Sequence, residues 1–175
     1  MYWFDGAYEA VARFMDMGGN VLWLIAILLF FMWMLILERA FYFSGALKGD
    51  VAHIVDTWEA RKERRSWSAY HIRRKLISEG KQKINRFMPI IKTLVALCPL
   101  LGLLGTVTGM IEVFNIMAVT GGGDAKSMAG GVSRATIPTM AGMVAALSGV
   151  FANTYLTRKA EREKAALNEK LTTDH

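Results

Sequence analysis

The fold is decided by two stretches of the sequence, LCPLLGLLGTVTG at residues 97–109 and TIPTMAG at residues 136–142. Both are apolar enough to enter a lipid bilayer, and both carry threonines inside the apolar run. Because lipid cannot satisfy a hydroxyl group, these threonines should face protein or water. The sequence between the two stretches is rich in glycine, which predicts a pair of membrane-spanning helices joined by a short loop.

Composition and charge extend the membrane assignment to the whole chain. Of its 175 residues 53% are hydrophobic, and they gather in long blocks. The net charge is +6 at pH 7, and thirteen of the 21 Lys and Arg lie at residues 38–92, with five more after Leu156. Basic residues on alternate connections follow the positive-inside pattern of membrane proteins. No motif that reads nucleic acid accompanies this charge, so we expect no nucleic-acid partner.

These blocks predict an all-α integral membrane protein with three transmembrane helices and long cytoplasmic helical extensions. In chain order, the expected segments are an amphipathic helix lying on the periplasmic face of the same membrane (1–20), the first transmembrane helix (21–37), a cytoplasmic helical connection (38–89), the second transmembrane helix (90–119), a periplasmic glycine-rich loop (120–131), the third transmembrane helix (132–156) and a cytoplasmic tail (157–175). Gly18 and Gly19 should break the chain before the first span. The acidic start is unlike a signal peptide.

Glycines in the two deciding stretches predict close packing of their helices. Gly105 and Gly109 form a GxxxG pattern, and small residues continue the packing face beyond Thr139 at steps of three and four. The expected helix-packing residues are Gly102, Gly105, Gly109, Gly142 and Gly149.

Two polar pairs should lie at matching heights in these helices. Antiparallel helices of equal rise place residues level when their numbers have a constant sum, which is about 245 for a turn near residue 122. Thr106 with Thr139 and Glu112 with Arg134 both meet this condition, provided that the helices pack side by side. The threonine pair should lie deeper in the membrane, and the charged pair should lie near the outer mouth.

Each pair leaves two interpretations open. Glu112 and Arg134 could form an ion pair that offsets the cost of charge in the membrane, or Arg134 could extend to the lipid head groups. Thr106 and Thr139 could bond to carbonyls of their own helices, or they could line a hydrated interface. A hydroxyl both donates and accepts hydrogen bonds, so the second arrangement could pass a proton along a water chain.

At these residues the chain resembles the MotA/TolQ/ExbB proton channel family. The run at residues 99–109 is similar to the second-helix signature of that family, and ATIPTMAGMVAA at residues 135–146 is similar to its third-helix counterpart. The three-span topology with a large cytoplasmic connection also matches, and within the family the chain looks most like ExbB. The resemblance implies that Thr106 and Thr139 are the family's pore-lining threonines.

The resemblance also implies an assembly and a location. The chain would form a homopentamer in the bacterial inner membrane, with its N-terminus in the periplasm and its C-terminus in the cytoplasm. The second and third helices would surround the single transmembrane helix of an ExbD-like partner, which contributes an aspartate. Proton movement would then drive a TonB-type protein that energises uptake across the outer membrane, for example of iron–siderophore complexes. A TolQ-like subunit of a Tol-Pal-type system and a non-conducting scaffold are the alternatives.

One departure from the family concerns the charged pair. The family often carries a glutamate where this chain has Arg134, while Glu112 occupies a position that is usually neutral and polar. Glu112 is the only acid in the second and third spans, and it lies near the mouth. Because a proton relay normally uses a titratable group at depth, that group should come from another chain.

An enzymatic function and a bound cofactor are not expected. The sequence shows no nucleophile–base pair and no set of metal ligands at useful spacing. His53 and His71 lie in the basic connection without a cluster of cysteines or carboxylates, which is not typical of a metal site. The single cysteine, Cys98, excludes an internal disulfide and lies in an apolar run as a small buried hydrophobe would.

Overall fold

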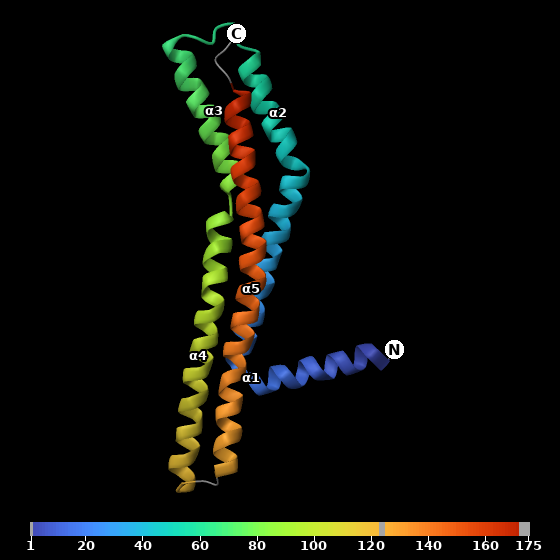
Figure 1. The fold of residues 1–175 in the computed structure, drawn as a ribbon, viewed down its shortest axis with the longest axis vertical. Helices are drawn as coiled ribbons and strands as arrows, with labels where there is room; N and C mark the ends of the chain where they lie inside the picture. Colours follow the sequence, from blue (N-terminus) through green and yellow to red (C-terminus); the bar gives the residue numbers. More distant parts are fainter. Residues whose placement is uncertain (1, 123–124, 172–175) are drawn as a thin grey trace. The chain divides into compact units, whose positions relative to one another are not determined.

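The computed structural model describes residues 2–122 and 125–171, and all of the regular structure in them is helical (Figure 1). The helices are α1 (Tyr2–Ser44), α2 (Ala46–Glu59), α3 (Trp67–Asn85), α4 (Met88–Thr120) and α5 (Ala125–Lys170). Three stretches are long and apolar enough to cross a membrane, namely Gly19–Ser44, Trp67–Thr120 and Met128–Lys170. The all-helical prediction with three helices suited to a bilayer is therefore confirmed. The predicted loop at 123–124 and the tail end at 172–175 lie outside the described residues.

The chain forms two compact units, each made from separate stretches of sequence. Unit 1 contains Met1–Trp33 and Thr93–Val150, and unit 2 contains Met34–Lys92 and Phe151–His175. Unit 1 therefore holds most of α4, the first part of α5 and the start of α1. Unit 2 holds the end of α1, all of α2 and α3, and the last part of α5.

In unit 1, α1 changes direction at Gly19, which has a non-helical backbone with φ 64° and ψ −161°. Only glycine adopts this conformation without strain, so the break that the sequence predicted before the first span is present. In Figure 1 the helical segment that precedes Gly19 leads away from α4 and α5. Its exposed apolar side chains include Tyr8, Val11 and Phe14.

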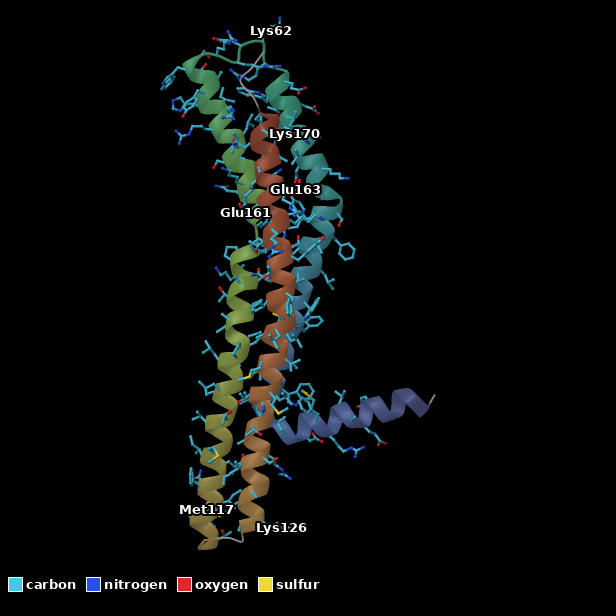
Figure 2. The ribbon with its side chains drawn as sticks, viewed as in Figure 1. Lys62, Met117, Lys126, Glu161, Glu163 and Lys170 are labelled. Atoms are coloured by element: carbon cyan, nitrogen blue, oxygen red, sulfur yellow. The ribbon has the colours of Figure 1, made fainter. Side chains whose placement is uncertain are left out.

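The connection between α4 and α5 is shorter than the sequence predicted. Gly121 and Gly122 turn the chain with φ of 72° and 89°, and α5 already begins at Ala125. Residues 125–131, expected as loop, are therefore helical. Gly121 and Gly122 supply two positive-φ positions directly after α4, and the later glycine pair at 130–131 continues α5. Figure 2 shows Met117 and Lys126 on either side of this connection.

The core of unit 1 is a narrow seam between α1, α4 and α5. Its buried residues are mostly small or slender: Leu22, Ile25, Met32, Val95, Cys98, Val113, Ala135, Ala145 and Ala146. Large apolar side chains on the opposite faces are exposed, among them Phe30, Leu100, Phe114 and Val144. A helix pair with a small-residue seam and bulky exposed faces is suited to contact with lipid. Cys98 is buried and its thiol contacts the Leu94 carbonyl oxygen at 3.4 Å.

Unit 2 packs α2, α3 and the end of α5 around large buried side chains. Trp58, Ile84, Leu167 and Leu171 are each at most 1% exposed. Ser66 caps α3 by accepting a hydrogen bond from the amide of Ala69 at 3.2 Å. The C-terminal sequence continues α5 to Lys170, as the helical tail prediction required, and Figure 2 shows Glu161 and Glu163 on this part of the helix.

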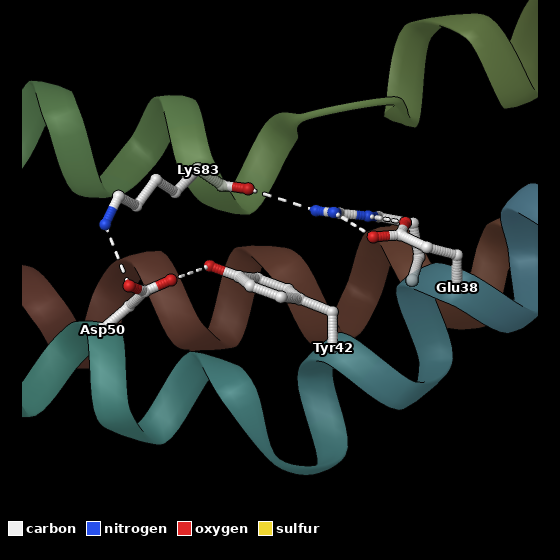
Figure 3. A network of polar contacts seen from close by, with 5 residues as sticks. Glu38, Tyr42, Asp50 and Lys83 are labelled. Atoms are coloured by element: carbon white, nitrogen blue, oxygen red, sulfur yellow. Dashed lines mark hydrogen bonds and ion pairs between the residues drawn. The ribbon is translucent and has the colours of Figure 1, made fainter.

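A polar network ties the end of α1 to α2 and α3 inside unit 2 (Figure 3). The Arg39 side chain is almost fully buried, donates to both carboxylate oxygens of Glu38 at 2.6 and 2.7 Å, and reaches the Lys83 carbonyl oxygen at 3.2 Å. The Lys83 ammonium and the Tyr42 hydroxyl both donate to Asp50, at 2.9 and 2.7 Å. These two bonds, the one from Lys83 above all, hold the pKa of Asp50 below its ordinary value.

Candidate functional site

Two threonine hydroxyls meet where α4 crosses α5 in unit 1. Thr106 Oγ1 of α4 and Thr139 Oγ1 of α5 form a hydrogen bond, and both residues are half-buried. The Thr139 hydroxyl also lies 2.9 Å from the Gly102 carbonyl oxygen of α4, and Thr106 lies 3.4 Å from the same oxygen. The constant sum of their residue numbers predicts that these two threonines lie at the same height.

The hydroxyl protons can be assigned along this triangle. Each hydroxyl has one proton to donate. If Thr139 donates to the nearer Gly102 carbonyl oxygen, Thr106 donates to Thr139. The Thr106 oxygen then keeps its lone pairs for a donor from outside, such as water or a partner chain. The triangle is thus a short hydrogen-bonded chain that ends on a backbone carbonyl oxygen and has an open accepting position at Thr106.

The other two threonines of the seam behave differently. The Thr108 hydroxyl donates to carbonyl oxygens of its own helix, Leu104 at 3.0 Å and Gly105 at 3.1 Å. The Thr136 hydroxyl donates to the Ser133 carbonyl oxygen at 2.7 Å, also within its own helix. Self-bonding therefore accounts for these two, while Thr106 and Thr139 bond across the helix pair.

Glycines create the space in which the threonines meet. A Cβ atom at Gly102 would lie 3.0 Å from both the Pro138 carbonyl oxygen and Thr139 Cα, and one at Gly142 would lie 2.5 Å from the Cys98 carbonyl oxygen. These neighbours are backbone atoms, which cannot rotate away. The glycines thus let α4 and α5 approach almost backbone to backbone.

The remaining glycines singled out in the sequence also lie in tight contacts. A Cβ atom at Gly105 would overlap the Pro138 ring, and one at Gly109 would lie 2.7 Å from Ala135 Cβ. One at Gly149 would lie 2.6 Å from the Met32 sulfur. Gly131, which the sequence analysis assigned to the loop, has a similar contact 2.5 Å from a Val113 methyl group. Gly131 is small and lies opposite the β-branched Val113. The sequence shows this only when α5 is known to begin at Ala125, before Gly131.

A cavity of about 460 Å³ in unit 1 is lined by polar and apolar residues of α1, α4 and α5. Glu112 and Arg134 both line it, with exposed side chains, and so does Thr108. Within residues 2–122 and 125–171, no ion pair closer than 4.0 Å joins Glu112 to Arg134. The two charges therefore share a cavity without direct contact.

Asp16 and Asn20 also line this cavity, and the sequence analysis did not assign them to it. They flank the kink at Gly19, whose backbone directs the preceding helix. The mouth therefore contains two carboxylates and one guanidinium. Gly105 and Pro138 form part of the same lining, and each is followed in sequence by one threonine of the pair.

The charged residues line the cavity, and the bonded threonines lie in uncharged stretches of α4 and α5. The 19 residues between Lys92 and Glu112 carry no charge, and neither do those from Ala135 to Thr157. No titratable carboxylate of these spans therefore lies at the depth of the threonines. Among the described residues, no group of three His, Cys, Asp or Glu side chains is placed to hold a metal ion.

Comparisons with known proteins point to a transport family. The family model described as the MotA/TolQ/ExbB proton channel family matches residues 40–169. An ExbB-like biopolymer transport protein of Synechocystis sp. is 46% identical over 68 residues, which are 37% of this chain and 27% of that protein. The biopolymer transport protein exbB1 of Vibrio cholerae is 33% identical over 96 residues, which are 54% of this chain and 42% of that protein.

A third relative is the biopolymer transport protein ExbB of Helicobacter pylori. It is 35% identical over 78 residues, which are 45% of this chain and 54% of that protein. The matches to the Synechocystis and Vibrio proteins span less than half of each relative's length, and the match to the Helicobacter protein spans about half.

Proposed function

This chain belongs to the MotA/TolQ/ExbB proton channel family, and on that premise we propose that it is a proton-channel subunit of the bacterial inner membrane. With an ExbD-like partner, it couples the proton motive force to a TonB-type protein that energises uptake across the outer membrane, such as that of iron–siderophore complexes. The chain acts as a homo-oligomer, a pentamer in the family's manner, with α4 and α5 lining the central pore.

The observation that carries this proposal is the hydroxyl contact between Thr106 and Thr139. A seam that served only to pack helices would leave each threonine bonded to its own helix, as Thr108 and Thr136 are. Thr106 and Thr139 instead also bond to each other across the helix pair, although Thr106 keeps a 3.4 Å contact with a carbonyl of its own helix. Because the chain ends on the Gly102 carbonyl oxygen, which has no proton to release, the two hydroxyls support a proton path by holding a water or a partner's acid at this height.

The proposal requires a partner that supplies the deep acid. A relay through a membrane normally uses a titratable group at depth, and α4 and α5 bring no carboxylate between Lys92 and Glu112 or between Arg134 and Arg158. A single-span helix with an aspartate at the height of Thr106 would complete the path. Asp16 and Glu112 would then exchange protons with periplasmic water in the outer cavity.

Proton flux into liposomes that contain the chain and its partner tests the proposal. We expect Thr106→Val and Thr139→Val each to lower the flux at least roughly tenfold, a barrier change of ~1.4 kcal/mol, with assembly intact. Thr136→Val is the matched control, because it deletes a hydroxyl on the same helix that bonds only within α5. Normal flux in the Thr106 and Thr139 variants would show that these hydroxyls are not on the proton path, and absence of flux in the wild type would favour a non-conducting scaffold.

The charged residues at the mouth have a separate test. Reversing both charges, Glu112→Arg with Arg134→Glu, restores flux if the residues act as a pair across the cavity. Because they are not in direct contact in one subunit, we expect each single reversal to lower flux independently and the double reversal to give no rescue. Rescue by the double reversal would show that assembly brings the two charges together.

The orientation in the membrane can be measured directly. We propose that the α4–α5 connection faces the periplasm and that α2 and α3 face the cytoplasm, as the distribution of basic residues requires. A membrane-impermeant thiol reagent should label Thr120→Cys in intact cells and should label His53→Cys only after lysis. The opposite pattern would invert the topology.

A further inference from the structure

A basic groove runs along one face of α3 and the first turn of α4 in unit 2. This groove has a volume of about 870 Å³ and contains four cationic side chains, Arg73, Arg74, Lys81 and Arg86. Its lining holds no carboxylate, and its end at α4 is apolar, formed by Phe87, Pro89 and Ile90. The residues of α3 recur at steps of three and four, so they share one helix face.

Most of the positive charge in the basic groove is not neutralised within the chain. Elsewhere on α3, Lys75 pairs with Glu79 at 3.7 Å and Lys83 pairs with Asp50 at 2.9 Å. Within the described part of the chain, Arg74, Lys81 and Arg86 have no carboxylate closer than 4.0 Å.

Arg73 differs from the other three cations because it is already engaged. Its guanidinium donates to the carbonyl oxygens of Leu171 and Asn168, the latter at 3.3 Å, near the end of α5. Among the described residues, the cations of the basic groove outside any ion pair are therefore Arg74, Lys81 and Arg86, and of these Arg86 also acts electrostatically on the Glu38 carboxylate.

The apolar end of the groove lies at the level of the lipid head groups once α4 spans a bilayer. The 19 uncharged residues between Lys92 and Glu112 span about 28 Å, close to the thickness of the hydrocarbon core. Ile90 is then about 5 Å outside that core, and Arg86 precedes it on the same side, beyond the start of α4 at Met88. From the membrane toward the water, the lining of the groove changes from the half-exposed Ile90 to cationic side chains. A phospholipid changes in the same order, from apolar acyl chains to a charged head group.

The backbone at this point is held in an unusual conformation. Phe87 has φ 65°, the only positive φ of a non-glycine residue in the described chain, and it separates α3 from α4. Such a conformation is strained for a bulky residue, and strained residues cluster at ligand sites. It sets the Arg86 guanidinium 5.0 Å from the Phe87 ring centroid at the apolar end of the groove.

We propose that the membrane-proximal half of the basic groove is a binding site for an anionic phospholipid, with Lys81 and Arg86 on its phosphate. The acyl-chain end of the glycerol lies against Pro89 and Ile90. Lipid with a net negative head group fits because the groove supplies uncompensated cations and no acceptor carboxylate. The inference rests on the part of the proposed function that places α4 across a membrane, and it is independent of proton conduction.

Native mass spectrometry of the detergent-solubilised chain tests this site. The chain is titrated with phosphatidylglycerol and, separately, with phosphatidylcholine, and the ratio of the two affinities is measured. We expect Lys81→Gln to lower the preference for phosphatidylglycerol about fivefold and Lys81→Gln with Arg86→Gln to lower it roughly thirtyfold. Lys81 is exposed, so its single variant should fold even if the double variant does not.

The matched control removes two cations that lie outside the groove, Lys62→Gln with Lys75→Gln. The same change in net charge should leave the preference within about twofold of the wild type, because these two cations do not line the groove. Non-specific attraction, which scales with charge alone, would instead lower the preference equally in both double variants. An equal loss in the control and in the groove variants would overturn the proposal.

Two further outcomes would also overturn it, and each points to another occupant. If glycerol phosphate displaces phosphatidylglycerol at equal concentration, the groove takes soluble phosphates rather than lipid. If the Lys81 and Arg86 variants change the oligomeric state and not the lipid preference, an acidic segment of a second copy fills the groove. The flux assay of the Thr106 and Thr139 variants tests the channel separately. Its outcome does not depend on the preference for phosphatidylglycerol, so the two proposals can fail independently.

Discussion

The two units of this chain hold their helices together by different means. In unit 1, α4 and α5 touch through glycines, and a Cβ atom added at Gly142 would meet the backbone of α4. In unit 2, large side chains such as Trp58 and Leu167 fill the core, and the buried Arg39 joins a polar network. In water, burial of apolar surface stabilises helix packing. In lipid this contribution is small, so helices associate through the close van der Waals contact that small residues allow.

The largest effect should come from removing Arg39 from unit 2. Arg39→Ala deletes the charge-assisted bonds to Glu38 and the bond to the Lys83 carbonyl, and it leaves a cavity in their place. We expect a loss of about 3 kcal/mol in stability, read as a lower thermal midpoint of the solubilised protein. Arg13→Ala is the control, because the Arg13–Glu9 pair is more than two-thirds exposed and should contribute under about 1 kcal/mol. Equal effects would show that burial of the network is irrelevant.

A methyl group in the seam of unit 1 should have the next largest effect. Gly142→Ala sets a Cβ 2.5 Å from the Cys98 carbonyl oxygen and 3.1 Å from Gly102 Cα, so the helices must separate. We expect a loss of about 2 kcal/mol and weaker subunit assembly. Gly130→Ala in the same helix meets nothing within 4 Å, and it should raise stability because alanine favours helix. The idea of a backbone-level seam fails if Gly142→Ala melts like the wild type.

The same substitution in unit 2 should cost less. A Cβ atom at Gly80 would overlap a terminal methyl group of Leu167, which is the far end of a flexible side chain. Because Leu167 can change rotamer, we expect Gly80→Ala to lose only about 1 kcal/mol, which thermal melts beside Gly142→Ala would measure. A larger loss at Gly80 than at Gly142 would reverse the contrast between the two units.

The sequence predicted the seam of unit 1 better than the features around it. Helix rise is fixed, so a constant sum of residue numbers was enough to bring Thr106 opposite Thr139. The start of α5 was misplaced because the glycine pair at 130–131 is compatible with both loop and helix. Asp16 was not assigned to the outer cavity because its position depends on the direction that the chain takes at Gly19.

Unit 2 was less predictable because its site residues meet over long distances in sequence. Arg39 reaches Lys83 across 44 positions, and nothing local in the sequence marks it as buried. The charge run on α3 was consistent with a solvated helix face. The groove that it lines also includes Phe87, whose left-handed backbone is a conformation that a sequence pattern does not indicate for a bulky residue.

The smallest effect should be a pH dependence centred on Asp50 in unit 2. Because bonds from Lys83 and Tyr42 lower the pKa of Asp50, the unfolded chain binds this proton more tightly than the folded chain. The stabilisation is therefore present above about pH 4 and is lost as the pH falls through the folded pKa. The thermal midpoints of wild type and Asp50→Asn should differ by a constant amount at neutral pH and converge in acid. The carboxylate is a third exposed, so solvent screening keeps this difference small.

Asp56→Asn, on the same helix and without a cation within 4.0 Å among the described residues, should show no such convergence. A constant difference for Asp50→Asn down to about pH 2 would mean that the network stabilises unit 2 without the charge of Asp50.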